Sequence, residues 1–309
     1  MINRELIRRK IVQLGYAYSH NECSSPEKAE KELLLSMSKA YELYNYLLAL
    51  IVAVTKEERL RVEIATNRAR REYKKGPSAR FANNRFAAQL EENLQLSQFL
   101  TSCGLTWDDD VDVIRRLCDM IESTDVYKKY MESDEDSYEA DRAVWKILYK
   151  IAILENADLD AVLEEKSIYW NDDKDVIDTF VMKTIKRFDP ENGEEQELLP
   201  DFDNEEDREF ACRLLRCSLQ NAEEYQSYMD GMSKNWDFSR LATMDVVIMQ
   251  TAIAEMLNIP NIPVNVTINE YVELAKCYST PKSASYINGM LDAIGRELKA
   301  QGKMIKPMK

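Results

Sequence analysis

Apolar residues recur at helical spacing near the start of the chain, and polar residues fill the positions between them. Over residues 1–18 the apolar positions are Leu6, Ile7, Ile11, Leu14 and Tyr18. This spacing predicts an amphipathic helix with its basic residues on the complementary side. Gly15 lies inside that helix at a cost of about 1 kcal/mol relative to alanine, so we expect it to pack closely against a neighbouring element.

A second predicted helix begins at Pro26, because proline is favoured in the first turn of a helix. Its pattern runs to about residue 55. A highly charged helical pattern continues over residues 56–75, until Gly76-Pro77-Ser78 interrupts it. We therefore place the first structural boundary at this interruption.

The middle of the chain carries further helical patterns over residues 82–130 and 139–188. Residues 190–206 contain two prolines, a glycine and a run of acidic residues, and this composition predicts a solvated linker.

The last third of the chain predicts four helices, over residues 207–232, 239–257, 267–278 and 281–300. Thr267 and Glu270 have the spacing of a capping box, which predicts that the third of these helices starts at Thr267. Pro281 begins the last one. No segment alternates in the manner of a strand, so the expected fold class is all-α.

The net charge of −14 at first argues against a nucleic-acid partner, which requires clustered cations. The charge is unevenly distributed, however. Residues 131–210 carry −17, which leaves +3 for the rest of the chain. The acidity is therefore confined to one block and leaves basic surfaces available elsewhere.

The residues needed for common catalytic and metal sites are scarce. His20 is the one histidine and is expected at the surface, and the six cysteines form no Cys-x-x-Cys pair. Glycine-rich phosphate-binding motifs are also missing from the sequence. We therefore predict no enzyme activity, no catalytic residues, no bound metal and no cofactor.

The sequence also predicts a cytoplasmic protein. The N-terminus is charged instead of carrying a secretory signal, and the longest apolar run, residues 47–54, is much shorter than the ~20 residues of a membrane span.

Two basic clusters are candidates for RNA contact. On the first predicted helix, Arg4 and Arg8 lie four residues apart on one face, and Gln13 and Tyr16 offer a hydrogen-bonding group and a stacking ring. The alternative is that this arginine-bearing face is only a solvated surface, on which Glu5 pairs with Arg9, four residues further on.

The second cluster is interleaved with Tyr73, Phe81 and Phe86, an arrangement that suits single-stranded RNA. Its basic residues are Arg68, Arg70, Arg71, Lys74, Lys75, Arg80 and Arg85. The alternative is that both phenylalanines belong to the core.

Several motifs, in the same order, resemble the NusB family of transcription antitermination factors. The N-terminal segment that contains Arg4, Val12, Gln13 and Tyr16 resembles its first helix. The C-terminal motifs are Trp236, Arg240-Leu241, Asp245, Ile248, Ala252, Glu255, Ile262-Pro263, Val266, Ile268-Asn269-Glu270, Val272-Glu273-Leu274-Ala275-Lys276 and Tyr286-Ile287-Asn288-Gly289-Met290-Leu291-Asp292.

The resemblance implies a pair of small helical bundles interrupted by an additional helical insertion. Its expected parts are NusB-like N-terminal helices over residues 1–50, a helical acidic insertion over 51–204, NusB-like C-terminal helices over 205–300, and a basic tail over 301–309.

The resemblance also implies a function in the transcription of ribosomal RNA operons. The chain would bind single-stranded boxA-type RNA, a NusE-like small-subunit ribosomal protein and the RNA polymerase antitermination complex. By this likeness Arg4, Arg8, Gln13 and Tyr16 would face RNA, together with Lys282, Ser283 and Tyr286 from the last helix.

The sequence departs from the family pattern where Glu5 and Leu6 replace further positive charge. A helical protein-interaction adaptor that no longer binds RNA is therefore the alternative function. A third reading, an RNA methyltransferase with a NusB-like domain, is disfavoured because only nine residues follow Ala300.

Among the motif residues, we expect Asn269, Glu273, Lys276, Asn288, Gly289 and Asp292 to have structural roles. Asn269 and Asn288 would satisfy backbone groups between helices, and Gly289 would permit close helix approach.

Overall fold

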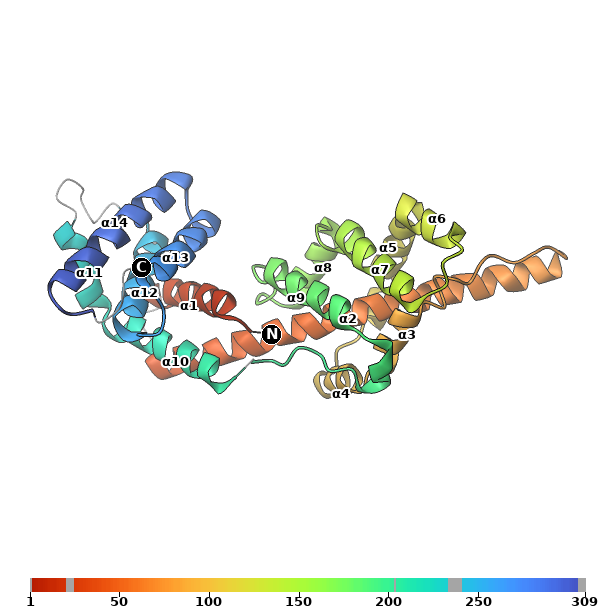
Figure 1. Ribbon diagram of the computed structural model, residues 1–309, viewed down its shortest axis with the longest axis horizontal. Helices are drawn as coiled ribbons and strands as arrows, with labels where there is room; N and C mark the ends of the chain where they lie inside the picture. Colours follow the sequence, from red (N-terminus) through yellow and green to blue (C-terminus); the bar gives the residue numbers. More distant parts are fainter. Residues whose placement is uncertain (1, 21–24, 203, 233–240, 305–309) are drawn as a thin grey trace. The chain divides into compact units, whose positions relative to one another are not determined.

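The computed structural model describes residues 2–20, 25–202, 204–232 and 241–304. These residues form helices joined by turns, with one isolated bridge between Ile2 and Phe202 and no sheet, so the predicted all-α fold is confirmed. The helices form two compact units (Figure 1). We call residues 39–200 the insertion unit, and residues 2–38 with 201–309 the terminal unit.

The terminal unit is built around one central helix. Its helices are α1 (Arg4–Ser19), the first part of α2 (Pro26–Arg71), α10 (Glu205–Gln220), α11 (Ala222–Met232), α12 (Thr243–Asn258), α13 (Val264–Tyr278) and α14 (Pro281–Ala300). Helix α12 packs against α1, α10, α11, α13 and α14. Ile248, Ala252 and Met256 are fully buried on it, as expected for a helix that is apolar on most of its surface.

Two predicted helix boundaries in this unit are wrong. Residues 207–232 form two helices that separate at Asn221. Helix α13 begins at Val264, three residues before the predicted capping box, with Pro263 at its N-cap position. The Thr267 hydroxyl does not cap the helix, because it donates a hydrogen bond to Glu255 at 2.8 Å.

The insertion unit contains the remainder of α2, which is one continuous helix over Pro26–Arg71, as the helical pattern that continues beyond residue 55 predicts. The other helices of this unit are α3 (Arg85–Glu92), α4 (Leu94–Cys103), α5 (Val111–Ser123), α6 (Asp125–Glu132), α7 (Tyr138–Leu148), α8 (Ala157–Lys166) and α9 (Lys174–Arg187). Short helical turns cover Asp108–Asp110, Tyr149–Ile153 and Pro190–Glu195. Aromatic side chains form much of its core, including Trp145, Tyr149, Phe81, Phe86 and Phe188.

The segment after Pro190 is mostly exposed, as its composition predicts, but it is not a free linker, because part of it packs against the insertion unit. Leu198 and Leu199 are buried, and the Asn93 side-chain amide donates to the Gln196 carbonyl at 2.7 Å. The Leu198 N–H in turn donates to the Gln95 side chain at 2.9 Å. Side-chain amides therefore hold the end of this polar segment against the unit.

The terminal unit contains both glycines for which the sequence predicts close packing, and the structure confirms this prediction at one of them. A Cβ atom at Gly15 would lie 2.9 Å from Val247 Cγ1, so the predicted close approach is confirmed. At Gly289 a Cβ would meet no atom within 4 Å, so the expectation of close helix approach there is wrong.

These two glycines give a matched test on the same unit. We expect Gly15→Ala to be destabilising, because overpacking costs about 1–3 kcal/mol and outweighs the gain in helix propensity. We expect Gly289→Ala to be neutral or stabilising by up to about 1 kcal/mol. Urea unfolding followed by circular dichroism checks both, and equal effects of the two substitutions would contradict the packing difference.

Candidate nucleic-acid interface

The N-terminal half of α1 is held in place by a charged network that begins at Arg8. Asn3 caps the helix by accepting the Leu6 N–H at 2.9 Å. One turn later the Arg8 guanidinium donates to both carboxylate oxygens of Glu255, at 2.8 and 3.1 Å, and to Glu270 at 3.0 Å. Arg8 is only 4% exposed, so it does not lie on the open RNA-facing surface expected from its spacing with Arg4.

Glu255 is the centre of this network and is fully buried on α12. Besides Arg8, it accepts hydrogen bonds from the hydroxyls of Thr267 at 2.8 Å and Tyr271 at 3.2 Å. Burial, followed by the charge of Glu255, raises the pKa of Tyr271 well above its ordinary value. Burial alone lowers the pKa of Arg8, but hydrogen bonding and attraction to Glu255 outweigh it and raise the pKa. The network therefore ties α1 to α12 and α13.

Arg4 lies partly exposed at the edge of this network. Its Nε donates to Asp207 at 3.1 Å, and its guanidinium carbon lies 5.1 Å from the centre of the Phe210 ring. The side chain remains 39% exposed, so part of it is open to solvent.

The C-terminal half of α1 is linked to the end of α13. The Gln13 side-chain amide donates to the Tyr278 hydroxyl at 2.8 Å. Tyr16, one turn further along α1, is exposed, and its ring lies 4.5 Å from that of His20. The polar side of α1 is thereby brought beside the turn between α13 and α14.

Helix α14 begins directly after this turn. Thr280 caps it by accepting the Ser283 N–H at 3.1 Å. Lys282 is exposed in the first turn, whereas Ser283 and Tyr286 are partly buried. A helix N-terminus with an exposed lysine favours a phosphate group, since its free N–H groups and the lysine are both positive.

The second basic cluster divides into two parts. Arg68, Arg70, Arg71, Lys74 and Lys75 are all exposed around the end of α2. Phe81 and Phe86 are buried in the core of the insertion unit, so the core alternative holds for both phenylalanines.

Most of the motif residues expected to be structural lie at the surface. Asn269, Glu273, Lys276, Asn288 and Gly289 are exposed, and Asp292 is partly exposed and pairs with Arg296 at 2.6 Å. A hollow of 460 Å³ lies between α13 and α14, lined by Val272, Lys276, Pro281, Ala284, Ser285 and Asn288. The expectation that Asn269 and Asn288 satisfy backbone groups between helices is therefore wrong.

Comparison with known proteins identifies the family. The NusB family model matches residues 179–296. The chain is 33% identical over 132 residues to the transcription antitermination protein NusB of Salinibacter ruber, a match that covers 41% of this chain and 82% of that protein. The chain belongs to the NusB family.

Two further NusB proteins are similar over shorter stretches. The Geobacter sulfurreducens protein is 42% identical over 95 residues, which cover 31% of this chain and 69% of the relative. The Chloroherpeton thalassium protein is 37% identical over 99 residues, which cover 32% of this chain but only 47% of the relative. No solved structure shows a significant match.

The NusB match covers α10 to α13 and nearly all of α14, and therefore includes Glu255, Tyr278 and Lys282. Two of the residues that carried the resemblance, Trp236 and Arg240, lie outside the described residues, as do Lys306 and Lys309 of the predicted basic tail. Sequence reasoning matched Glu255 to the family helix but missed its role as the partner of Arg8. It gave no signal for Tyr278, whose role depends on the fold.

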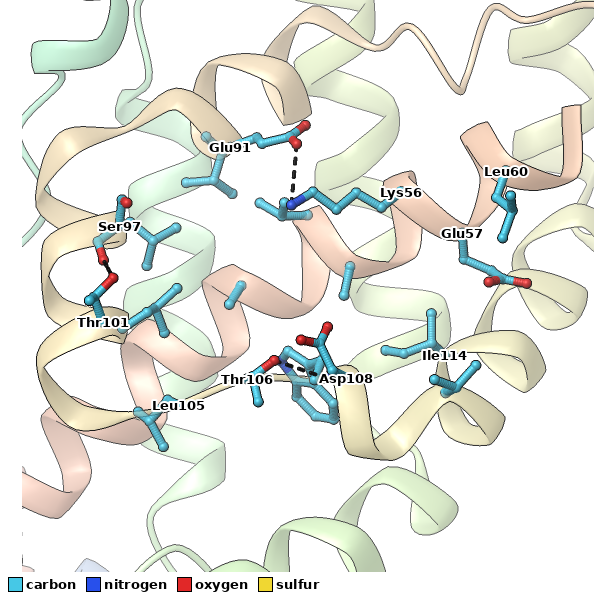
Figure 2. A pocket seen from close by; sticks show the side chains of 18 residues that line it. Lys56, Glu57, Leu60, Glu91, Ser97, Thr101, Leu105, Thr106, Asp108 and Ile114 are labelled. Atoms are coloured by element: carbon cyan, nitrogen blue, oxygen red, sulfur yellow. Dashed lines mark hydrogen bonds and ion pairs between the residues drawn. The ribbon is translucent and has the colours of Figure 1, made fainter. Parts of the chain in front are cut away.

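The insertion unit lies largely outside the NusB match and contains a groove of 460 Å³ (Figure 2). The groove runs along α2 and is lined mainly by apolar side chains such as Leu60, Leu100 and Ile114. Among its charged groups, Lys56 lies 3.2 Å from Glu91, Glu57 contacts two arginines, and Asp108 is exposed to solvent. We therefore assign no proton-transfer chemistry to it.

Within the described ranges no group of His, Cys, Asp and Glu side chains is arranged to hold a metal ion. No helix in this part of the chain is both long enough and apolar enough to cross a bilayer.

Proposed function

We propose that this NusB family protein is a non-catalytic transcription antitermination factor that binds boxA-type single-stranded RNA of ribosomal RNA operons. The observation that carries the proposal is the hydrogen bond between Gln13 and Tyr278, at 2.8 Å. It brings the exposed Tyr16 end of α1 beside the turn that leads into Lys282. A ring that can stack and a helix start that can bind an anion therefore lie in the same unit, which supports the proposal of one RNA interface.

Each residue of this proposed RNA surface has a distinct task. Tyr16 stacks on an unpaired base, while Lys282 and the start of α14 bind a phosphate. Arg4 contributes the positive charge of its partly exposed side chain. Ser283 and Tyr286 line the first turns of α14, and Gln13 positions α1 against Tyr278. Arg8 is left out of the RNA surface, because its guanidinium is buried and held by two carboxylates.

We further propose that a NusE-like small-subunit ribosomal protein binds the exposed face of α13 and α14. This proposal is supported by the surface position of Lys276 and Asn288, family-motif residues that the fold does not use for packing. These two residues line a hollow whose other lining side chains are mostly apolar. Such a combination of apolar and polar groups is typical of protein-binding surfaces.

Binding of a labelled boxA-like RNA and of a scrambled RNA, across a salt series, tests the RNA surface. We expect Tyr16→Ala to weaken boxA binding by about 1–3 kcal/mol while Tyr16→Phe retains it. Lys282→Ala should reduce the salt slope by about 0.7, the contribution of one phosphate contact in a single strand. Lys299→Ala, an exposed lysine in the last turn of α14, is the matched control and should change neither quantity.

The same titration with the ribosomal protein added tests the partner surface. Asn288→Arg should remove the enhancement of RNA binding by the partner, while Ala293→Arg, exposed elsewhere on α14, should leave it intact. If the partner binds but no RNA is preferred at any salt concentration, the RNA proposal fails and the protein is an adaptor.

A further inference from the structure

The end of α2 has a residue in a conformation that favours glycine. The Lys74 N–H donates to the Ala69 carbonyl at 2.8 Å, and the Tyr73 N–H to the Arg70 carbonyl at 3.3 Å. These two bonds define a Schellman motif, in which the residue at the Tyr73 position is left-handed and is usually glycine. Tyr73 has φ of 54°, a conformation that costs free energy for a residue with a Cβ.

The side chain of Tyr73 makes no packing contact that would offset this strain. Its relative exposure is 100%, so the ring buries no surface against the protein. Glycine would satisfy the same backbone hydrogen bonds without the steric cost. A fully exposed aromatic ring in a strained position indicates a role in binding, because folding does not account for it.

Positive charge surrounds this ring. Arg68, Arg70, Arg71, Lys74 and Lys75 are exposed, and the acidic residue among them is Glu72, which bridges Arg68 at 3.2 Å and Lys74 at 2.9 Å. The insertion unit as a whole has a net charge of −11. A polyanion is therefore repelled by most of the unit and attracted to the end of α2.

The structure also separates these residues from the rest of the second basic cluster. Arg80 donates to the carbonyls of Ser133 and Glu135 and lies over the Tyr130 ring. Arg85 is paired with Asp136 and Asp141, each at 2.6 Å. Both arginines therefore hold the insertion unit together. Around Tyr73, Glu72 pairs only with Arg68 and Lys74, so Arg70, Arg71 and Lys75 have no carboxylate partner among the described residues.

We propose that residues 68–75, here named the basic tip, form a second binding site for single-stranded RNA. Tyr73 stacks on an unpaired base, and Arg70, Arg71, Lys74 and Lys75 neutralise the phosphates on either side of it. The choice of RNA as the ligand rests on the proposed function, whereas the site itself lies outside the NusB match at residues 179–296. Stacking is tolerant of base identity, so the basic tip adds affinity without adding sequence preference.

The test uses the full chain and a labelled oligouridine RNA that contains no boxA-like element. Tyr73→Gly should weaken binding by about fivefold to 150-fold, as expected for the loss of one stacked base. The same substitution should leave the thermal unfolding midpoint unchanged or raise it, because glycine relieves the strained backbone. Tyr73→Phe should bind as the wild type does. Weaker binding by Tyr73→Gly at undiminished stability is a result that a purely structural tyrosine does not give.

Two double variants, each of which removes two positive charges, test whether the cations of the basic tip bind phosphates. Arg70→Ala with Arg71→Ala should reduce the salt slope by about 1.4, the value for two phosphate contacts on a single strand. Lys128→Ala with Lys129→Ala removes two exposed cations from α6 in the same unit and should leave the slope unchanged. Crosslinking of 4-thiouridine RNA should label the peptide that contains Tyr73.

The outcome separates this proposal from the antitermination function. If Tyr73→Gly weakens oligouridine binding equally when Tyr16→Ala and Lys282→Ala are also present, the basic tip acts on its own. If boxA preference is absent but the tip still crosslinks to RNA, the antitermination proposal fails and the tip proposal stands. Three results would overturn the proposal for the basic tip. They are wild-type affinity of Tyr73→Gly for oligouridine, the absence of any oligouridine binding, and an equal change of the salt slope by the arginine double variant and the lysine double variant. Tighter binding of oligodeoxyuridine than of oligouridine would overturn RNA as its ligand.

Discussion

Glu255→Ala is expected to destabilise the terminal unit by about 3–5 kcal/mol, the usual cost of removing one partner from a buried ion pair. The substitution leaves the Arg8 guanidinium buried with only the partly exposed Glu270 as a charged partner. It also removes the acceptor of the Thr267 and Tyr271 hydroxyls. Urea unfolding, followed by the circular dichroism of the helices, measures the loss.

The control is Glu273→Ala on α13, which removes an exposed carboxylate paired with Lys276. A surface pair contributes about 0–1 kcal/mol, so this change should alter the free energy of unfolding very little. Replacing both buried partners, Arg8→Met with Glu255→Leu, should recover much of the stability, because neither charge is then left alone. A loss below about 1 kcal/mol for Glu255→Ala would show that the network does not stabilise the unit.

This network also affects how substitutions on α1 are interpreted. Arg8→Ala will reduce RNA binding wherever it unfolds the terminal unit, although Arg8 is not a proposed RNA contact. Its effect on RNA binding should therefore disappear under conditions in which the variant is fully folded. Tyr16→Ala and Lys282→Ala, at exposed positions, should keep their effects under those conditions.

The hydrophobic pattern predicted α1, α12 and α14 well, because each has an apolar surface whose period matches the helix. The same reasoning failed for Arg8. Its spacing from Arg4 is that of one exposed face, but the carboxylates that bury it lie 247 and 262 residues further along the chain. No local pattern contains partners at such separations.

The motif residues of α13 and α14 show a second limit of sequence reasoning. A polar residue within a recognisable motif can serve packing or binding, and only the packed structure shows which side of the helix is covered. Gly15 and Gly289 both lie inside helices, yet only a Cβ atom at Gly15 would meet a neighbouring side chain. For the segment after Pro190, composition predicted solvent exposure, but distant amides such as Asn93 fix its backbone.

The insertion unit has an aromatic core of its own, and Trp145→Ala tests whether it is a separate cooperative unit. Trp145 is fully buried on α7, and its ring lies 5.3 Å from that of Phe81. Removing a buried aromatic ring costs about 3–5 kcal/mol. Trp145→Phe should cost less than about 1.5 kcal/mol, because it keeps a ring in place and removes an indole N–H that has no acceptor among the described residues.

Hydrogen exchange resolved by peptide mass spectrometry locates the effect. In Trp145→Ala we expect the amides of α3, α7 and α9 to lose protection, because α7 packs against both other helices. The amides of α12, α13 and α14 should remain protected, since their buried side chains belong to the terminal unit. Equal loss of protection in α12 and α7 would show that the chain unfolds as one cooperative structure, and that the insertion depends on the NusB-like helices for its stability.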